Sequence, residues 1–289
     1  MFPKLLSIHS FVLPTYGLLV ATGFVAGLAV ALRLSQREGL DKEKIYNLGI
    51  YLVLAGMIGS KLFLLYQDRD YYWNNPREIF SLSTLQSGGV FYGGLLTAIL
   101  VALWYARKSQ IPFLKMADAF APGIALGHAF GRLGCFAAGC CWGNPTSLPW
   151  GVTFSDPYSH EIVGVPLGTP LHPTQLYESA AEAVIFVFLY LRYRHKRFDG
   201  QILGWYLLLY PTARFFVEFL RSHAGEALLW GNTISDAQAI SVLLVGCAVW
   251  LLWISPSRRR QMMLAASPAP VSKRHAVAQI HRAAKLPRH

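Results

Sequence analysis

The sequence predicts an all-α polytopic membrane protein with seven transmembrane helices. Three observations support this fold class. Hydrophobic residues make up 54% of the 289 residues and charged residues only 14%, well below the roughly 25% of a soluble domain. Seven apolar runs approach the ~20 residues that cross a bilayer. Basic residues also gather in alternate connections between these runs.

The predicted spans follow one another with mostly short connections. The first run could be read as a signal peptide, but Lys4 is a weak basic region and the run is too long for that role, so we expect it to be retained. The fourth run is the least apolar. Its Ala and Gly residues predict close contact with other helices. In order, the spans are 11–32, 45–66, 89–106, 114–134, 174–191, 201–220 and 236–254.

The distribution of charge predicts the orientation. Of the 26 Lys and Arg residues, 18 fall in the connections after the first, third, fifth and seventh spans, and Lys115 lies at the edge of the fourth span on the same side. The opposite side has only Lys4, Arg69, Arg77 and Arg221. The positive-inside rule therefore places the N-terminus outside and the C-terminus in the cytoplasm. The net charge of +11 then indicates contact with anionic lipid rather than with nucleic acid.

The chain divides into a transmembrane region and a tail. Residues 1–254 are expected to form one seven-helix domain, whose outer loop, 142–172, is either a lid or a passive connector. Residues 255–289 are basic and rich in Ala and Pro, so we expect a disordered cytoplasmic tail.

The four cysteines are Cys135, Cys140, Cys141 and Cys247. None has the C-x-x-C spacing of a zinc or redox motif, so we expect packing residues and no metal site. Redox sensing or metal binding is the alternative for the first three.

Three cations fall inside predicted spans: Lys61, Arg132 and Arg214. With a helix rise of ~1.5 Å per residue, each lies about 20–27 Å from the cytoplasmic end of its span. All three therefore belong to the outer half of the bilayer. Ionisable residues at such depth are candidates for function. The structural alternatives are pairing of the arginines with Glu218, Asp118 or Glu178, and snorkelling, above all for Lys61.

Other polar residues are expected at the same depth. Glu218 follows Arg214 by four residues and should pair with it, and Arg221 lies beyond. His128, four residues before Arg132, is expected to be a satisfied interhelical histidine. The span ends contribute Tyr16, Tyr92, His172, Gln175, Tyr177 and Glu178.

Two arginines at one depth suit an anionic oxygen ligand. A guanidinium stays charged in a poor solvent and donates two parallel hydrogen bonds to a phosphate. In "GRLGCFAAGCCWG", residues 131–143, glycines such as Gly143 would let a headgroup approach the backbone. We therefore expect a phospholipid phosphate between Arg132 and Arg214. A transporter or channel is disfavoured because the charges gather in one half of the bilayer.

Five motifs in order, "PTYGLL", "SGGVFYGG", "GRLGCFAAGCCWG", "HPTQLYES" and "ARFFVEFLR", resemble the bacterial prolipoprotein diacylglyceryl transferases from about residue 10 to 254. The resemblance implies a multi-pass enzyme of the bacterial inner membrane that needs no cofactor. Such an enzyme transfers the diacylglyceryl group of phosphatidylglycerol to the lipobox cysteine of a prolipoprotein signal peptide and releases glycerol phosphate. The essential basic side chains of the family match Arg132 and Arg214, and its following Glu and Arg match Glu218 and Arg221.

The chain departs from the family at several positions. Tyr92 stands where a His is common, Lys61 where an Arg is usual, and Cys135, Ala138 and Cys140 where Asn, Asn and Glu are common. These changes leave open a diverged homologue that binds phospholipid but uses another acceptor or none. They also leave the proton acceptor open between Tyr92, His172 and His128.

In the transferase mechanism, the two arginines bind the headgroup phosphate and stabilise charge on the leaving oxygen. The attacking group is a thiolate. Tyr92 either orients the phosphate or relays a proton, and a tyrosine is a poor base unless its pKa is perturbed.

Overall fold

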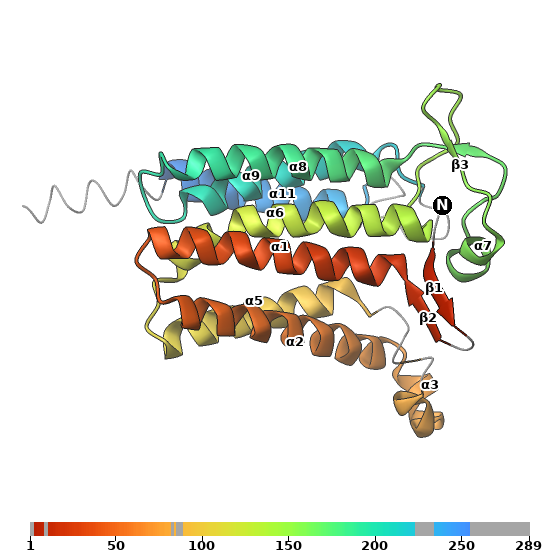
Figure 1. Ribbon diagram of the computed structural model, residues 1–289, viewed down its shortest axis with the longest axis horizontal. Coiled ribbons are helices and arrows are strands. Elements are labelled where there is room, and N and C mark those ends of the chain that lie inside the picture. The colour runs from red at the N-terminus through yellow and green to blue at the C-terminus, as the bar shows by residue number, and fades with distance from the viewer. Residues whose placement is uncertain (1–2, 9–10, 82–83, 85–88, 223–233, 255–289) are drawn as a thin grey trace, which may run out of the picture.

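The computed structural model describes residues 3–8, 11–81, 84, 89–222 and 234–254. The predicted tail, 255–289, lies outside the described residues. Most of the described chain is helical. Its long helices, which alternate in direction along the bundle (Figure 1), are α1 (Thr15–Arg37), α2 (Lys42–Gln67), α5 (Phe91–Lys108), α6 (Phe113–Ala138), α8 (Thr174–Tyr193), α9 (Gln201–Glu218) and α11 (Asp236–Val249), and α11 continues into η2 (Trp250–Ile254).

By length and composition alone, three helical segments of the described chain are apolar enough to cross a membrane: Thr15–Arg37, Lys42–Gln67 and Asp236–Trp253. The first span was predicted to begin at residue 11, and this boundary was wrong. Phe11–Pro14 form strand β2, paired antiparallel with β1 (Lys4–Ile8), so the helix begins at Thr15. Pro14 provides the extended residue before the first turn, as its fixed φ favours.

The all-α prediction missed short strands at the end of the bundle that carries this hairpin (Figure 1). There, β3 (Val152–Thr153) pairs with β4 (Pro170–Leu171) within the 142–172 loop. The helices α3 (Arg69–Asn74), η1 (Pro76–Phe80) and α7 (Pro157–Val163) complete the described connections. Phe154, Val165 and Leu171 form a small buried core inside the loop, so this loop has a fixed internal structure.

Glycines bring α1 and α6 into close contact, as the small residues of the fourth span predicted. A Cβ added to Gly27 would lie 2.5 Å from the backbone oxygen of Gly123, and one added to Gly23 would lie 2.9 Å from that of Gly127. Such approach is possible only without side chains. The pair fixes α6, and with it Arg132, against the N-terminal helix.

At the end opposite the hairpin, a buried carboxylate joins α6 to α9. Asp118 accepts hydrogen bonds from the backbone nitrogens of Gly200, 2.8 Å, and Leu203, 2.9 Å, the donors that a helix N-terminus leaves unpaired. Lys196 lies among three carboxylates, with Nζ at 2.9 Å from Glu38, 3.3 Å from Asp118 and 3.1 Å from Asp199. Asp118 is therefore not a partner of the intramembrane arginines.

Candidate functional site

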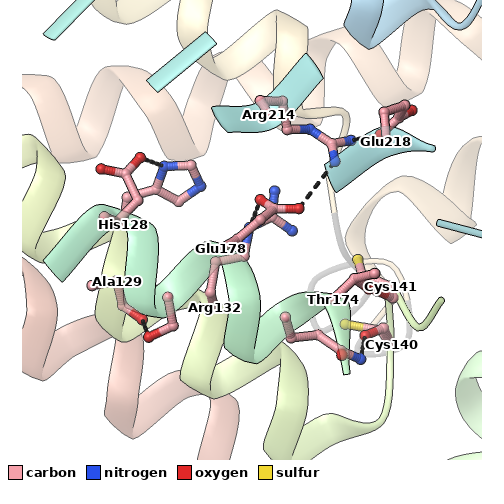
Figure 2. Close-up of polar contacts among 12 residues, drawn as sticks. His128, Ala129, Arg132, Cys140, Cys141, Thr174, Glu178, Arg214 and Glu218 are labelled. Carbon is pink, nitrogen blue, oxygen red and sulfur yellow. Dashed lines mark hydrogen bonds and ion pairs between the residues drawn. The ribbon is translucent and has the colours of Figure 1, made fainter. Parts of the chain in front are cut away.

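Three neighbouring helices each place two polar residues one turn apart on an inward face. Residues four apart lie on the same side of a helix. The pairs are His128 and Arg132 on α6, Glu178 and Glu182 on α8, and Arg214 and Glu218 on α9. Ion pairs join these side chains across the helices: His128 with Glu182, Arg132 with Glu178, and Arg214 with both Glu178 and Glu218; Figure 2 shows Arg132, Glu178, Arg214 and Glu218 facing one another.

The two predicted arginines share one carboxylate. Glu178 Oε2 lies 2.7 Å from Arg132 Nε, and Glu178 Oε1 lies 3.0 Å from Arg214 Nη1. Glu218 Oε2 pairs with Arg214 Nη2 at 2.7 Å, which confirms the predicted i,i+4 pair. Figure 2 shows Glu178 between the two guanidinium groups. The arginines are thus close together, and both have acidic partners.

The pairs are buried, which makes their charge balance important. Exposed fractions of the side chains are 9% for Arg214, 5% for Glu178 and 14% for Arg132. Buried charges persist only when they are paired. Two guanidinium groups and two carboxylates balance, but Glu178 divides its single charge between both arginines. Arg132, the more exposed arginine, has only this shared carboxylate as an ion-pair partner among the described residues.

His128 has a structural partner, as predicted. Its Nδ1 lies 2.6 Å from Glu182 Oε1, and its ring packs edge-on against Tyr210. Ser179 donates to the Ala129 carbonyl at 2.9 Å, so α6 and α8 are joined by a second contact close to the His128–Glu182 pair. Because Nδ1 is engaged by a carboxylate, His128 is poorly placed to take a proton through that atom.

Tyr92 and Arg221 approach the same charges from other elements. Tyr92 belongs to the first turn of α5, is partly exposed, and interacts electrostatically with Arg214, Glu218 and Arg221. No ion pair to Arg221 occurs among the residues that the structure describes. Arg221 adds a third guanidinium to a neighbourhood that holds the three carboxylates of Glu178, Glu182 and Glu218.

Gly143 is the point where three backbone segments meet. Its nitrogen donates to the His172 carbonyl at 2.9 Å, and Asn144 donates to the Leu220 carbonyl at 2.8 Å. A Cβ on Gly143 would lie 2.6 Å from the Leu220 oxygen. The space on the Cβ side of Gly143 is therefore occupied by neighbouring backbone, which explains why a glycine stands at this position.

His172 and Tyr177 connect loop 142–172 to α8. His172 Nδ1 lies 3.3 Å from the Tyr177 hydroxyl, which accepts a hydrogen bond from Trp150 Nε1 at 2.8 Å. The three side chains bind the loop to the first turns of the helix. Loop 142–172 is thus held over the predicted site by specific contacts.

The start of α8 also holds the cysteine segment. Gln175 Nε2 donates to the Cys140 carbonyl at 2.6 Å, and the Thr174 hydroxyl donates to the Cys141 carbonyl at 2.8 Å (Figure 2). Beyond the end of α6, the pKa of the Cys141 thiol is lowered, first by hydrogen bonds from Cys135 and Cys140 and then by the charges of Arg221 and Arg132.

The remaining predicted residues lie around this centre. Tyr16 lies in the first turn of α1 and packs closely against Gly134, where an added Cβ would lie 3.0 Å from the tyrosine ring. Tyr16 also interacts electrostatically with Arg132. Lys61 Nζ donates to the Thr84 carbonyl at 2.6 Å, in the connection between α2 and α5.

The sequence analysis placed Glu178 among the polar residues at this depth and as a possible partner of the arginines, and it did not single out Glu182. Both glutamates could have been recognised from their position, because they are acidic residues within an otherwise apolar predicted span.

Comparisons with known proteins give matches over most of the chain. The sequence profile described as "Prolipoprotein diacylglyceryl transferase" matches residues 3–254. Proteins named phosphatidylglycerol–prolipoprotein diacylglyceryl transferase are similar over most of the chain. The one from Finegoldia magna is 33% identical over 82% of this chain and 88% of its own length. The one from Clostridium tetani is 32% identical over 89% of this chain and 99% of its own length. The one from Nitratidesulfovibrio vulgaris is 35% identical over 82% of this chain and 88% of its own length.

Proposed function

This chain belongs to the prolipoprotein diacylglyceryl transferase family, and on that premise we propose that it transfers the diacylglyceryl group of phosphatidylglycerol to the lipobox cysteine of prolipoproteins. We place it in the bacterial inner membrane as a seven-span domain, residues 1–254, with the N-terminus outside. The observation that carries the proposal is the pair of buried guanidinium groups around one shared carboxylate.

The charge balance suits a phosphodiester. Its single negative charge can be offset by Arg221, which has no ion pair among the described residues, together with the guanidinium of Arg132. When the headgroup enters, Arg132 needs only to turn part of its guanidinium from Glu178 toward a phosphate oxygen. Arg214 keeps Glu218 as a partner and so stays in place, and a donor that is positioned before charge develops is a large source of electrostatic catalysis.

The reaction forms one bond and breaks one. The thiolate sulfur attacks the diacylglyceryl carbon that carries the phosphate, and the carbon–oxygen bond breaks. The phosphate oxygen leaves with the electron pair, as glycerol phosphate with a second negative charge. Arg132 and Arg214 stabilise that added charge, which is present in the transition state and not in the bound lipid. Tyr92 is placed to orient the phosphate from α5.

A transfer assay tests the proposal. The purified chain in phosphatidylglycerol liposomes should add one diacylglyceryl group to a lipobox peptide and release glycerol phosphate. Arg132→Gln should lower the rate by about 100-fold or more, as expected for loss of a donor to a developing charge. Arg69→Gln is the matched control, because Arg69 is on the same predicted side and 69% exposed.

The diverged-homologue alternative is supported by Tyr92 and by the cysteines at positions 135 and 140. It predicts binding of phosphatidylglycerol without modification of the peptide. If the wild-type chain binds the lipid but transfers nothing to a lipobox peptide, the transferase proposal is wrong.

A further inference from the structure

Three thiols converge at the outer end of α6. The sulfur atoms of Cys135, Cys140 and Cys141 all lie within 4.8 Å of one another, and none of the three forms a disulfide. All three residues are partly exposed, so the cluster is open to a ligand. The spacing in the sequence did not predict this, because C-x4-C-C is not a recognised metal motif.

The backbone is bent to bring the thiols together. The helix ends at Gly139, whose φ of 82° reverses the chain, and Cys141 has a φ of 62° although it is not glycine. Without such a bend, consecutive side chains of an extended segment point to opposite sides. Non-glycine residues in this conformation persist where the surroundings enforce them, often at functional sites. Gln175 and Thr174 hold the bend through the carbonyls of Cys140 and Cys141.

The arrangement suits a metal better than it suits a disulfide or simple packing. A disulfide would use two thiols and leave the third unexplained. Zinc–sulfur bonds of ~2.3 Å in a tetrahedron place neighbouring sulfur atoms about 3.8 Å apart, so closing the cluster requires a contraction of about 1 Å or less. Thiolates select zinc or cuprous copper among common metals. Three protein ligands with one open position are typical of catalytic zinc.

Charges nearby favour such a complex. Three thiolates and Zn²⁺ carry a net charge of −1, and a fourth thiolate makes it −2. Arg221 and Arg132 act electrostatically on Cys141 and offset this charge. Figure 2 shows Cys140 and Cys141 beside Thr174, and Thr174 is one turn from Glu178 on α8. A nucleophile held at the thiols would therefore be near the proposed phosphate site.

We propose that Cys135, Cys140 and Cys141 bind one Zn²⁺ and leave a fourth position for the sulfur of the incoming lipobox cysteine. The inference rests on the proposed function and supplies the thiolate that this function requires. A thiol bound to zinc is deprotonated outright, so no side-chain base is needed where Tyr92 stands.

In the proposed transfer, the lipobox S–H loses its proton to water when sulfur binds zinc. The zinc-bound sulfur then forms the bond to the diacylglyceryl carbon, the bond from that carbon to the phosphate oxygen breaks, and glycerol phosphate leaves with the electron pair. The neutral thioether that results binds zinc weakly and departs.

Metal content is the first test. The full chain, purified in detergent after growth with zinc, should contain about one zinc ion per chain. Cys135→Ser, Cys140→Ser and Cys141→Ser should each reduce that content at least about tenfold, because a thiolate ligand is lost. Cys247→Ser is the matched control and should keep the zinc, since Cys247 is exposed on α11. Copper in place of zinc, or a metal-free protein with two thiols oxidised, would overturn the proposal.

Ligand binding at the fourth position is the second test. In the Co²⁺-substituted chain, a lipobox peptide should change the visible spectrum, and the same peptide with serine for cysteine should not. Identical spectra with both peptides would overturn the open position. This readout does not need catalysis.

Activity separates the two proposals. Removing zinc from the wild-type chain should abolish transfer, and adding zinc should restore it. Undiminished transfer by the zinc-free chain would overturn the role of zinc in forming the thiolate and leave the transferase function intact. No transfer by the zinc-loaded wild-type chain would refute the transferase function, and the spectrum of the Co²⁺-substituted chain would still decide the metal site.

Discussion

Substitutions at Glu178 and Arg132 best separate the effect of the buried charges on stability from their effect on catalysis. Its carboxylate is 5% exposed and serves both guanidinium groups, at 2.7 Å and 3.0 Å. Glu178→Gln leaves two buried cations with one carboxylate, and breaking a buried pair in this way costs about 3–5 kcal/mol. Arg132→Gln should cost less, about 2–3 kcal/mol, because Glu178 keeps Arg214 as its partner.

The double variant Arg132→Gln/Glu178→Gln should be more stable than the two single effects predict. Two amides can pair without charge, so we expect a coupling of about 1–3 kcal/mol. The assay is the free energy of unfolding of the full chain in detergent micelles, measured for all four proteins. Effects that add to within about 0.5 kcal/mol would refute the coupling.

Transfer activity should not follow stability in this cycle. The double variant lacks the guanidinium that the proposal places on the phosphate, so it should remain as inactive as Arg132→Gln. If activity returns together with stability, Arg132 acts only through the fold.

Three further perturbations test the architecture. Gly27→Ala should lower the free energy of unfolding by about 1–3 kcal/mol, because the new methyl group would lie 2.5 Å from a backbone oxygen. Gly56→Ala is the control: its methyl group meets nothing within 4 Å, so the same measurement should show no loss of stability or a gain. Asp118→Ala should cost about 2–3 kcal/mol, because two buried N–H groups at the start of α9 lose their acceptor; an unchanged unfolding curve would contradict this. Burial on its own lowers the pKa of Lys196, but the surrounding carboxylates raise it above its ordinary value of 10.5. The stability from this group should therefore be complete below pH 10.5 and disappear as the pH rises through the higher folded-state pKa; Lys196→Gln should remove that step from the pH profile of unfolding, and an identical profile in both proteins would count against it.

The sequence was most informative where one helix alone determines the contact. Arg214 and Glu218 are four residues apart, so their pairing follows from helix geometry, and the small residues of α6 predict its close approach to α1. The meeting of Arg132 with Glu178 depends on how α6 and α8 align, which no local pattern specifies. The partner of Asp118 likewise depends on where α9 begins in space.

The outer end was harder to predict. The β1–β2 hairpin falls within an apolar stretch, and hydropathy does not separate a short strand from the beginning of a span. The cysteines converge because of two left-handed backbone positions and because α8 binds their carbonyls. Neither feature has a signal in the spacing of the thiols.

Rescue of a bacterium depleted of its own prolipoprotein diacylglyceryl transferase tests the central claim most directly. The account predicts that this chain and its Arg69→Gln variant sustain growth with lipoproteins that carry the diacylglyceryl group, and that Arg132→Gln, present in the membrane at equal level, does not. Equal rescue by Arg132→Gln, or no rescue by a wild-type chain that reaches the membrane, would contradict it.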